Sequence, residues 1–161
     1  MNRHASCTIC GLSERDFVFI AVAGLLGEIV LEFVAWVIFP PLLGVPMRPH
    51  ILVTDLGRSL LGVEMPVQLA VAIHLALGFF IFPIVYVIAR RALGMRSWLL
   101  ASVLWGVLLW AIAQTTLAPL AGRPFMLGII PYTWGSLFAH VVYTVAVGWV
   151  FETLSRRFAD G

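Results

Sequence analysis

Four apolar stretches, each long enough to cross a bilayer, constrain this chain more than any other feature of its sequence. A helix needs about 20 mainly apolar residues to cross the hydrocarbon core. Hydrophobic residues make up 61% of the chain and charged residues 11%, against about 45–50% and about 25% in soluble domains. We therefore expect an all-α membrane protein built on a four-transmembrane-helix bundle. The four stretches are Phe17–Phe39, Val67–Ala89, Trp98–Ala118 and about Ile129–Leu154.

The positions of the arginines predict the orientation of the bundle. All ten basic residues are Arg. Seven lie in the two tails and the middle connector, whereas only Arg48, Arg58 and Arg123 lie in the first and third connectors. Because Lys and Arg accumulate on the cytoplasmic side, both termini should be cytoplasmic, in the bacterial inner membrane. The bundle should then span 17–157, between a tail at 1–16 and a short tail at 158–161.

The chain also contains an internal repeat. Pro41–Pro46 and Pro119–Pro124 share a PLxGxP pattern after the first and third stretches. His74 precedes Arg90-Arg91 by the spacing that separates His140 from Arg156-Arg157. The sequence thus predicts two repeated helical hairpins, at about 17–91 and 98–157, related by an axis along the membrane normal.

The first external connector is longer than its counterpart and has an amphipathic pattern. Within His50–Leu61, four aliphatic residues fall on one helical face and four polar residues on the other. This pattern predicts a short amphipathic helix that lies on the outer membrane surface. Alternatively, the helix caps the outer mouth of the bundle.

Three segments resemble the small bacterial YagU-like membrane proteins, which are of uncharacterised function. They are Asp55–Gly62, the span that carries His74 and Gly78, and Gly135–His140. The resemblance extends over about residues 20 to 157 and implies a four-helix membrane fold without implying an activity.

Four ionisable residues lie inside the spans: Glu28, Glu32, His74 and His140. Each costs at least about 2.5–3.5 kcal/mol at the helix centre, so such residues are functional candidates by default. No Arg lies at that depth to neutralise the acids. The acids therefore need a His partner, a proton, a bound cation or a basic group from another subunit.

Three hypotheses account for these residues. In the first, His74 and His140 are the axial ligands of one b-type haem, held between parallel helices for electron transfer. In the second, Glu28, Glu32, His74 and His140 bind a divalent metal such as Zn, Fe or Mn, or relay protons. In the third, the four side chains only form hydrogen bonds between helices.

The N-terminal tail carries a separate candidate site. His4, Cys7 and Cys10 form a His-x-x-Cys-x-x-Cys run, which offers at most three metal ligands and is incomplete on its own. We expect free thiols on a cytoplasmic tail, or otherwise a metal or redox site.

The sequence contains no phosphate-binding loop, dinucleotide fingerprint or nucleophile–base pair, so an enzyme is the less favoured class. With little chain outside the bilayer, the favoured role is an accessory subunit of a larger respiratory or photosynthetic membrane complex. The expected partners are the lipid bilayer and other membrane subunits or further copies of this chain, without nucleic acid.

Overall fold

The structure is a computed structural model that describes residues 12–44 and 47–158. All of the regular elements in this part of the chain are helices, with no strand among them, and they are joined by short connectors. Four helices are long and apolar enough to cross a membrane, which confirms the number and placement of the expected spans. These helices cover Glu14–Leu43, Val67–Ala92, Trp98–Leu120 and Pro131–Arg157.

The first span consists of α1 (Glu14–Phe33), the π-helical η1 (Val34–Ile38) and α2 (Phe39–Leu43). It begins earlier than hydropathy predicts, because Ser13 and Asp16 form a reciprocal capping box. A capping box satisfies two of the backbone amides that a helix start leaves free.

The second span consists of α4 (Val67–Ala76), the π-helical η2 (Leu77–Ile81) and α5 (Phe82–Ala92). It runs beyond the predicted end at Ala89 because the Arg90-Arg91 pair continues the last helical turn. Positively charged side chains stabilise the C-terminus of a helix. The length of an apolar stretch does not predict this extension, because the added residues are charged.

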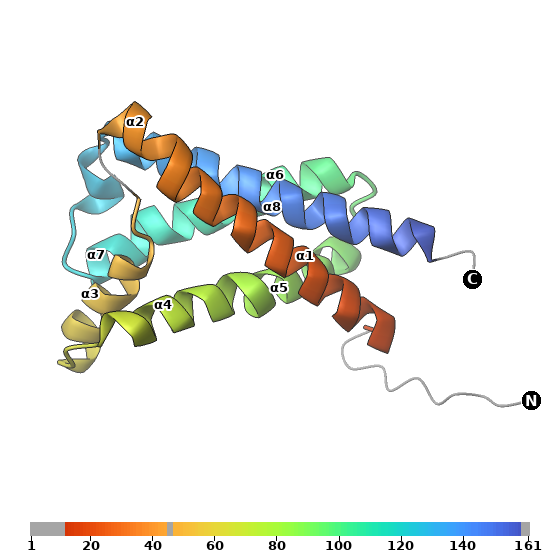
Figure 1. Ribbon diagram of the computed structural model, residues 1–161, viewed down its shortest axis with the longest axis horizontal. Coiled ribbons are helices and arrows are strands. Elements are labelled where there is room, and N and C mark those ends of the chain that lie inside the picture. The colour runs from red at the N-terminus through yellow and green to blue at the C-terminus, as the bar shows by residue number, and fades with distance from the viewer. Residues whose placement is uncertain (1–11, 45–46, 159–161) are drawn as a thin grey trace, which may run out of the picture.

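The third span consists of α6 (Trp98–Ile112), the π-helical η3 (Ala113–Leu117) and α7 (Ala118–Leu120). The 3₁₀ turn η4 (Phe125–Gly128) leads into the fourth span, α8 (Pro131–Arg157). Figure 1 shows α1 crossing the other helices diagonally, and α8 packs against both α1 and α6.

Each π-helical segment ends two residues before a proline: Pro40, Pro83 and Pro119. In each case the residue just before that proline donates its amide to the carbonyl five residues back. The proline cannot make the next such bond because it has no N–H. Each of these three spans therefore contains a carbonyl that needs a donor from elsewhere.

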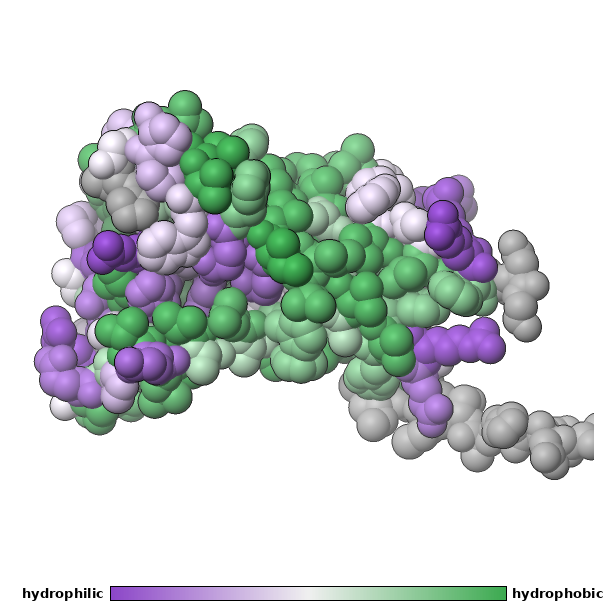
Figure 2. All heavy atoms as spheres, viewed as in Figure 1, coloured by the Kyte–Doolittle hydropathy of each residue, from purple (hydrophilic) through white to green (hydrophobic). Residues whose placement is uncertain are grey.

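The molecule has two polar ends and an apolar middle, as Figure 2 shows. We call the end with the start of α1, the α5–α6 turn and the end of α8 the terminal end (Figure 1). There, Arg91 pairs with Asp16 at 2.6 Å and Arg90 pairs with Glu152 at 2.7 Å. These ion pairs tie α5 to α1 and to α8.

The opposite end, which we call the connector end, carries the expected amphipathic helix, α3 (His50–Leu61). This helix packs against α4 and α7. Asp55 also accepts two hydrogen bonds from Arg123, at 2.5 and 2.8 Å. The structure thus packs α3 against two of the spans at the connector end, while its position on the membrane surface and its capping of the bundle both stay predictions.

The two PLxGxP turns share a backbone feature. Gly44 and Gly122 both lie in the left-handed region, with φ of 73° and 76°. Glycine adopts this conformation without the steric cost that a Cβ imposes. The similarity accords with the repeat, while the duplication of the two hairpins stays a prediction.

Candidate functional site

Glu28 is the most deeply buried charged side chain among the described residues. Its exposure is only 5%, and neither carboxylate oxygen has a hydrogen-bond partner within the described chain. A buried polar group without a partner costs about 1–3 kcal/mol, and more if it is charged. Such an arrangement is expensive unless something binds the carboxylate.

Gly78 provides the space for this carboxylate. A Cβ placed on Gly78 would lie 1.3 Å from Glu28 Oε1, so no larger residue fits there while Glu28 holds its position. One turn earlier on α1, a Cβ on Gly24 would lie 2.0 Å from the Phe79 carbonyl oxygen. The two glycines therefore allow the backbones of α1 and η2 to approach closely, and this contact positions Glu28.

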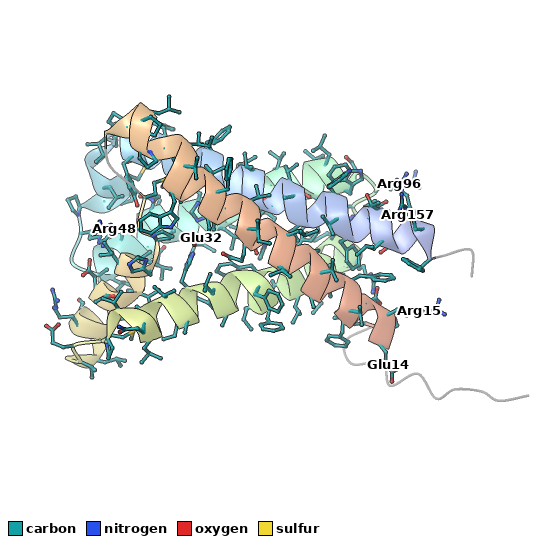
Figure 3. All side chains as sticks on the ribbon, in the orientation of Figure 1. Glu14, Arg15, Glu32, Arg48, Arg96 and Arg157 are labelled. Atoms are coloured by element: carbon teal, nitrogen blue, oxygen red, sulfur yellow. The ribbon has the colours of Figure 1, made fainter. Side chains whose placement is uncertain are left out.

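Glu32 follows Glu28 by one turn on the same face of α1. Its Oε2 accepts a hydrogen bond of 2.6 Å from Trp36 Nε1. This bond leaves Oε1 available, and one third of the side chain is exposed. Figure 3 places Glu32 between the α1 and α4 ribbons, and Figure 2 shows hydrophilic atoms in this region that continue toward the connector end and border hydrophobic atoms toward the middle of the molecule.

His74 on α4 completes the cluster. Its Nε2 lies 3.8 Å from Glu32 Oε1, too far for a hydrogen bond, and it is buried without a partner in the described chain. One ligand atom each from Glu28, Glu32 and His74 lies within 4.8 Å of the other two. We call these three residues the carboxylate–histidine cluster.

A tyrosine on α8 forms a hydrogen bond with the backbone of Gly78. In the π-helical register, the amide of residue 83 would bond to the Gly78 carbonyl, but this residue is Pro83. The hydroxyl of the buried Tyr143 on α8 donates to that carbonyl instead, at 2.6 Å. Tyr143 thereby ties α8 to the turn against which Glu28 packs.

His140 lies outside the cluster, although the sequence grouped it with the other three residues. Its Nδ1 lies 2.7 Å from the Ser136 carbonyl oxygen of its own helix. Ser136 in turn accepts a hydrogen bond of 3.2 Å from Gln114 Nε2 on η3. His140 is therefore part of a polar contact between α8 and the third span.

The side chains of the cluster are of kinds that bind metal cations or protons. Two carboxylates and one imidazole converge with no guanidinium nearby, because each described Arg lies outside the four spans or in their end turns. Carboxylate oxygen and imidazole nitrogen are ligands for divalent metals such as Zn, Fe and Mn. The same groups can also take up and pass on protons.

Sequence reasoning missed Tyr143 completely and treated Pro83 as an ordinary span residue. A proline inside a span is itself a signal, since it leaves a carbonyl that another helix must satisfy. The other candidate site, formed by His4, Cys7 and Cys10, lies outside the described residues.

Comparison with known proteins gives a family. Residues 15–159 match a model described as "Family of unknown function (DUF6789)". No curated protein and no solved structure matches the chain significantly, so the resemblance to YagU-like proteins is not confirmed by a named relative. Because the match covers all four spans and most of the chain, this protein belongs to the DUF6789 family.

Proposed function

We propose that this protein binds a divalent metal cation within the membrane through Glu28, Glu32 and His74. The main support for this proposal is a group of polar atoms that lack hydrogen-bond partners. Both oxygens of Glu28 and Nε2 of His74 are buried and have no hydrogen-bond partner among residues 12–44 and 47–158, and they lie in one cluster with Glu32 Oε1. A single cation would satisfy all of these atoms at once.

The charge of the cluster supports a divalent ion. With a neutral imidazole, ionised Glu28 and Glu32 carry two negative charges that no Arg of the described residues compensates. Leaving two carboxylates charged and unpaired at this depth is costly. A divalent cation brings the site to neutrality, whereas otherwise the acids must bind protons.

The distances also suit a metal. Bonds of about 2.0–2.2 Å from nitrogen and oxygen to one tetrahedral ion place two ligand atoms roughly 3.4 Å apart. The 3.8 Å between His74 Nε2 and Glu32 Oε1 is slightly larger than this. Small rotations of the two side chains bring both atoms within bonding distance of one ion. Three protein ligands leave a coordination position open for water or a substrate.

The test is metal analysis of the purified protein. Protein in detergent, freed of metal and then exposed to Zn²⁺ or Mn²⁺, should retain about one ion per chain. Glu28→Gln and His74→Ala should each reduce retention at least about tenfold, because removing a ligand removes a charge or a donor. The matched controls are His140→Ala and Glu64→Gln, which lie outside the cluster and should bind as the wild type does. Equal retention by Glu28→Gln and wild type would contradict the proposal.

Haem b remains an alternative that needs His74 and His140 together. The cluster does not include His140, which makes the haem hypothesis weaker than the metal hypothesis. An absorption spectrum separates the two, because only bound haem gives a Soret band.

An accessory role in a larger membrane complex is the second candidate function. An apolar cleft of about 380 Å³ on the surface of α6 and α8 favours it, since a partner helix can pack there. The cleft is lined by Trp98, Val141, Val142, Val145, Ala146 and Trp149.

A native gel of the solubilised membrane tests this second candidate. The wild type should migrate in a complex well above its 17.7 kDa mass. Ala146→Phe, which fills the cleft, should release the protein from the complex. Leu104→Phe, at an exposed position on α6 outside the cleft, is the control and should not. Migration of the wild type without a partner would exclude this role.

The proposed location is the bacterial inner membrane, with the terminal end in the cytoplasm. Its support is the arginine asymmetry, since all three arginines predicted to be external lie toward the connector end, in the α2–α4 connector or just after α7.

A further inference from the structure

We propose that the connector end carries a specific site for the phosphodiester headgroup of an anionic phospholipid. The site is an open cleft of about 320 Å³ that lies apart from the carboxylate–histidine cluster. It is lined by Arg48, Ile51, Arg123, Leu127, Ile130 and Tyr132.

The cleft is formed where three separate parts of the chain meet. Arg48 precedes α3, Arg123 follows α7, and Tyr132 lies in the first turn of α8. The ion pair between Arg123 and Asp55 joins two of these parts, so the cleft is built by tertiary contacts. Figure 3 shows Arg48 at the connector end.

The charge of the cleft favours a single anion. Asp55 neutralises Arg123 through two hydrogen bonds to the same oxygen. Arg48 is exposed and pairs with no carboxylate in the described part of the chain. The net charge is therefore about one positive unit, which one phosphodiester balances. A guanidinium binds phosphate oxygens through two parallel hydrogen bonds.

Arg48 differs from the other arginines that lack a carboxylate partner here. Arg15, Arg96 and Arg157 at the terminal end are also exposed, but none of them lines the cleft at Arg48 or either of the other two clefts described here. Among the described arginines without a carboxylate partner, Arg48 is the one that lines one of these three clefts.

The depth and the apolar walls point to a lipid as the source of the phosphate. The third span ends at Leu120 and the fourth begins at Pro131, so Arg123 and Tyr132 lie at the level where headgroups meet the hydrocarbon core. Ile130 is 49% exposed beside them. An acyl chain can pack against such apolar walls, whereas a free phosphate ion gains nothing from them.

Native mass spectrometry of the whole protein in micelles doped with phosphatidylglycerol tests the site. The wild type should retain one lipid, and Arg48→Gln should lower its affinity about tenfold or more, as expected for a lost charged hydrogen bond. Tyr132→Phe should lower it less. Arg96→Gln is the matched control, because it removes the same charge from an exposed position at the other end.

Three outcomes would overturn the proposal. The first is equal loss of lipid by Arg48→Gln and Arg96→Gln, since that is a general effect of charge. The second is retention of phosphatidylglycerol by Arg48→Gln with wild-type affinity. The third is complete displacement of the lipid by millimolar inorganic phosphate, since the cleft would then bind free phosphate.

Discussion

The carboxylate of Glu28 occupies the space in which a side chain at Gly78 would lie. A Cβ on Gly78 would come within 1.3 Å of Glu28 Oε1 and 2.5 Å of Glu28 Cδ. The two residues belong to different spans, so the position of an acid on α1 depends on the absence of a side chain on η2. Substitutions at Gly78 and Glu28 should therefore affect each other's cost in unfolding free energy.

Gly78→Ala should displace Glu28 and weaken the whole cluster. Overpacking of a filled interior costs about 1–3 kcal/mol, and the displaced carboxylate no longer faces His74. We expect a lower free energy of unfolding in an SDS titration, together with loss of metal retention. Gly135→Ala is the control, because a Cβ there meets the end of the movable Leu43 side chain at 3.0 Å and the Phe39 ring at an ordinary contact distance of 3.5 Å.

Removing the Glu28 carboxylate should also relieve the clash between this side chain and a Cβ at position 78. In a Glu28→Ala background the carboxylate is gone, so adding a methyl group at Gly78 should cost much less than in the wild type. The two substitutions should be non-additive by about 1–3 kcal/mol. Simple additivity in the double-mutant cycle would show that Glu28 does not fill this space.

Tyr143→Phe should destabilise the protein because it removes the hydroxyl that, among the described residues, donates to the Gly78 carbonyl left free by Pro83. Hydrogen bonds between transmembrane helices contribute about 0.6 kcal/mol on average and up to about 1.7. In a Pro83→Ala background, residue 83 regains an N–H that can donate to Gly78. The effect of Tyr143→Phe should therefore shrink in that background, and an unchanged effect would refute the proposed role of the proline.

Arg90→Gln and Glu152→Gln should each destabilise the terminal end and should be non-additive. This pair joins α5 to α8 at 2.7 Å, with only 16% and 18% of the two side chains exposed. A partly buried pair should contribute about 1–3 kcal/mol, between the values for exposed and buried pairs. The exposed pair of Arg58 and Glu64 is the control, and breaking it should destabilise the protein less than breaking the Arg90–Glu152 pair, because solvent screens exposed charges.

Cysteine labelling tests the proposed orientation. In a Cys7→Ser, Cys10→Ser background, an impermeant reagent added outside should label Ser59→Cys and should not label Leu93→Cys. Both positions are exposed, so only the side of the membrane distinguishes them. Labelling of Leu93→Cys alone would invert the assignment.

The fold could largely be predicted from the sequence because apolar length determines the spans directly. Hydropathy located all four, and amphipathic periodicity located α3. The ends of the spans were less accurate, since Ser13 and the Arg90-Arg91 pair extend helices with polar residues that hydropathy does not count.

The candidate site could be predicted only in part. Counting residues gives the depth of a side chain but not the direction in which it points around the bundle. That is why the sequence grouped His140 with Glu28, Glu32 and His74, whereas the structure brings together only the last three. The crossing of α1 and η2 at Gly78 depends on tertiary packing, which no local pattern encodes.

The most direct test of the central proposal is X-ray absorption at the zinc edge of the Zn²⁺-loaded protein. A metal bound by Glu28, Glu32 and His74 should show one imidazole and oxygen ligands, at about 2.0–2.2 Å from the metal. The imidazole signal should disappear in His74→Ala and persist in His140→Ala. Failure to retain zinc, or an imidazole signal that disappears in His140→Ala, would contradict a metal site formed by Glu28, Glu32 and His74.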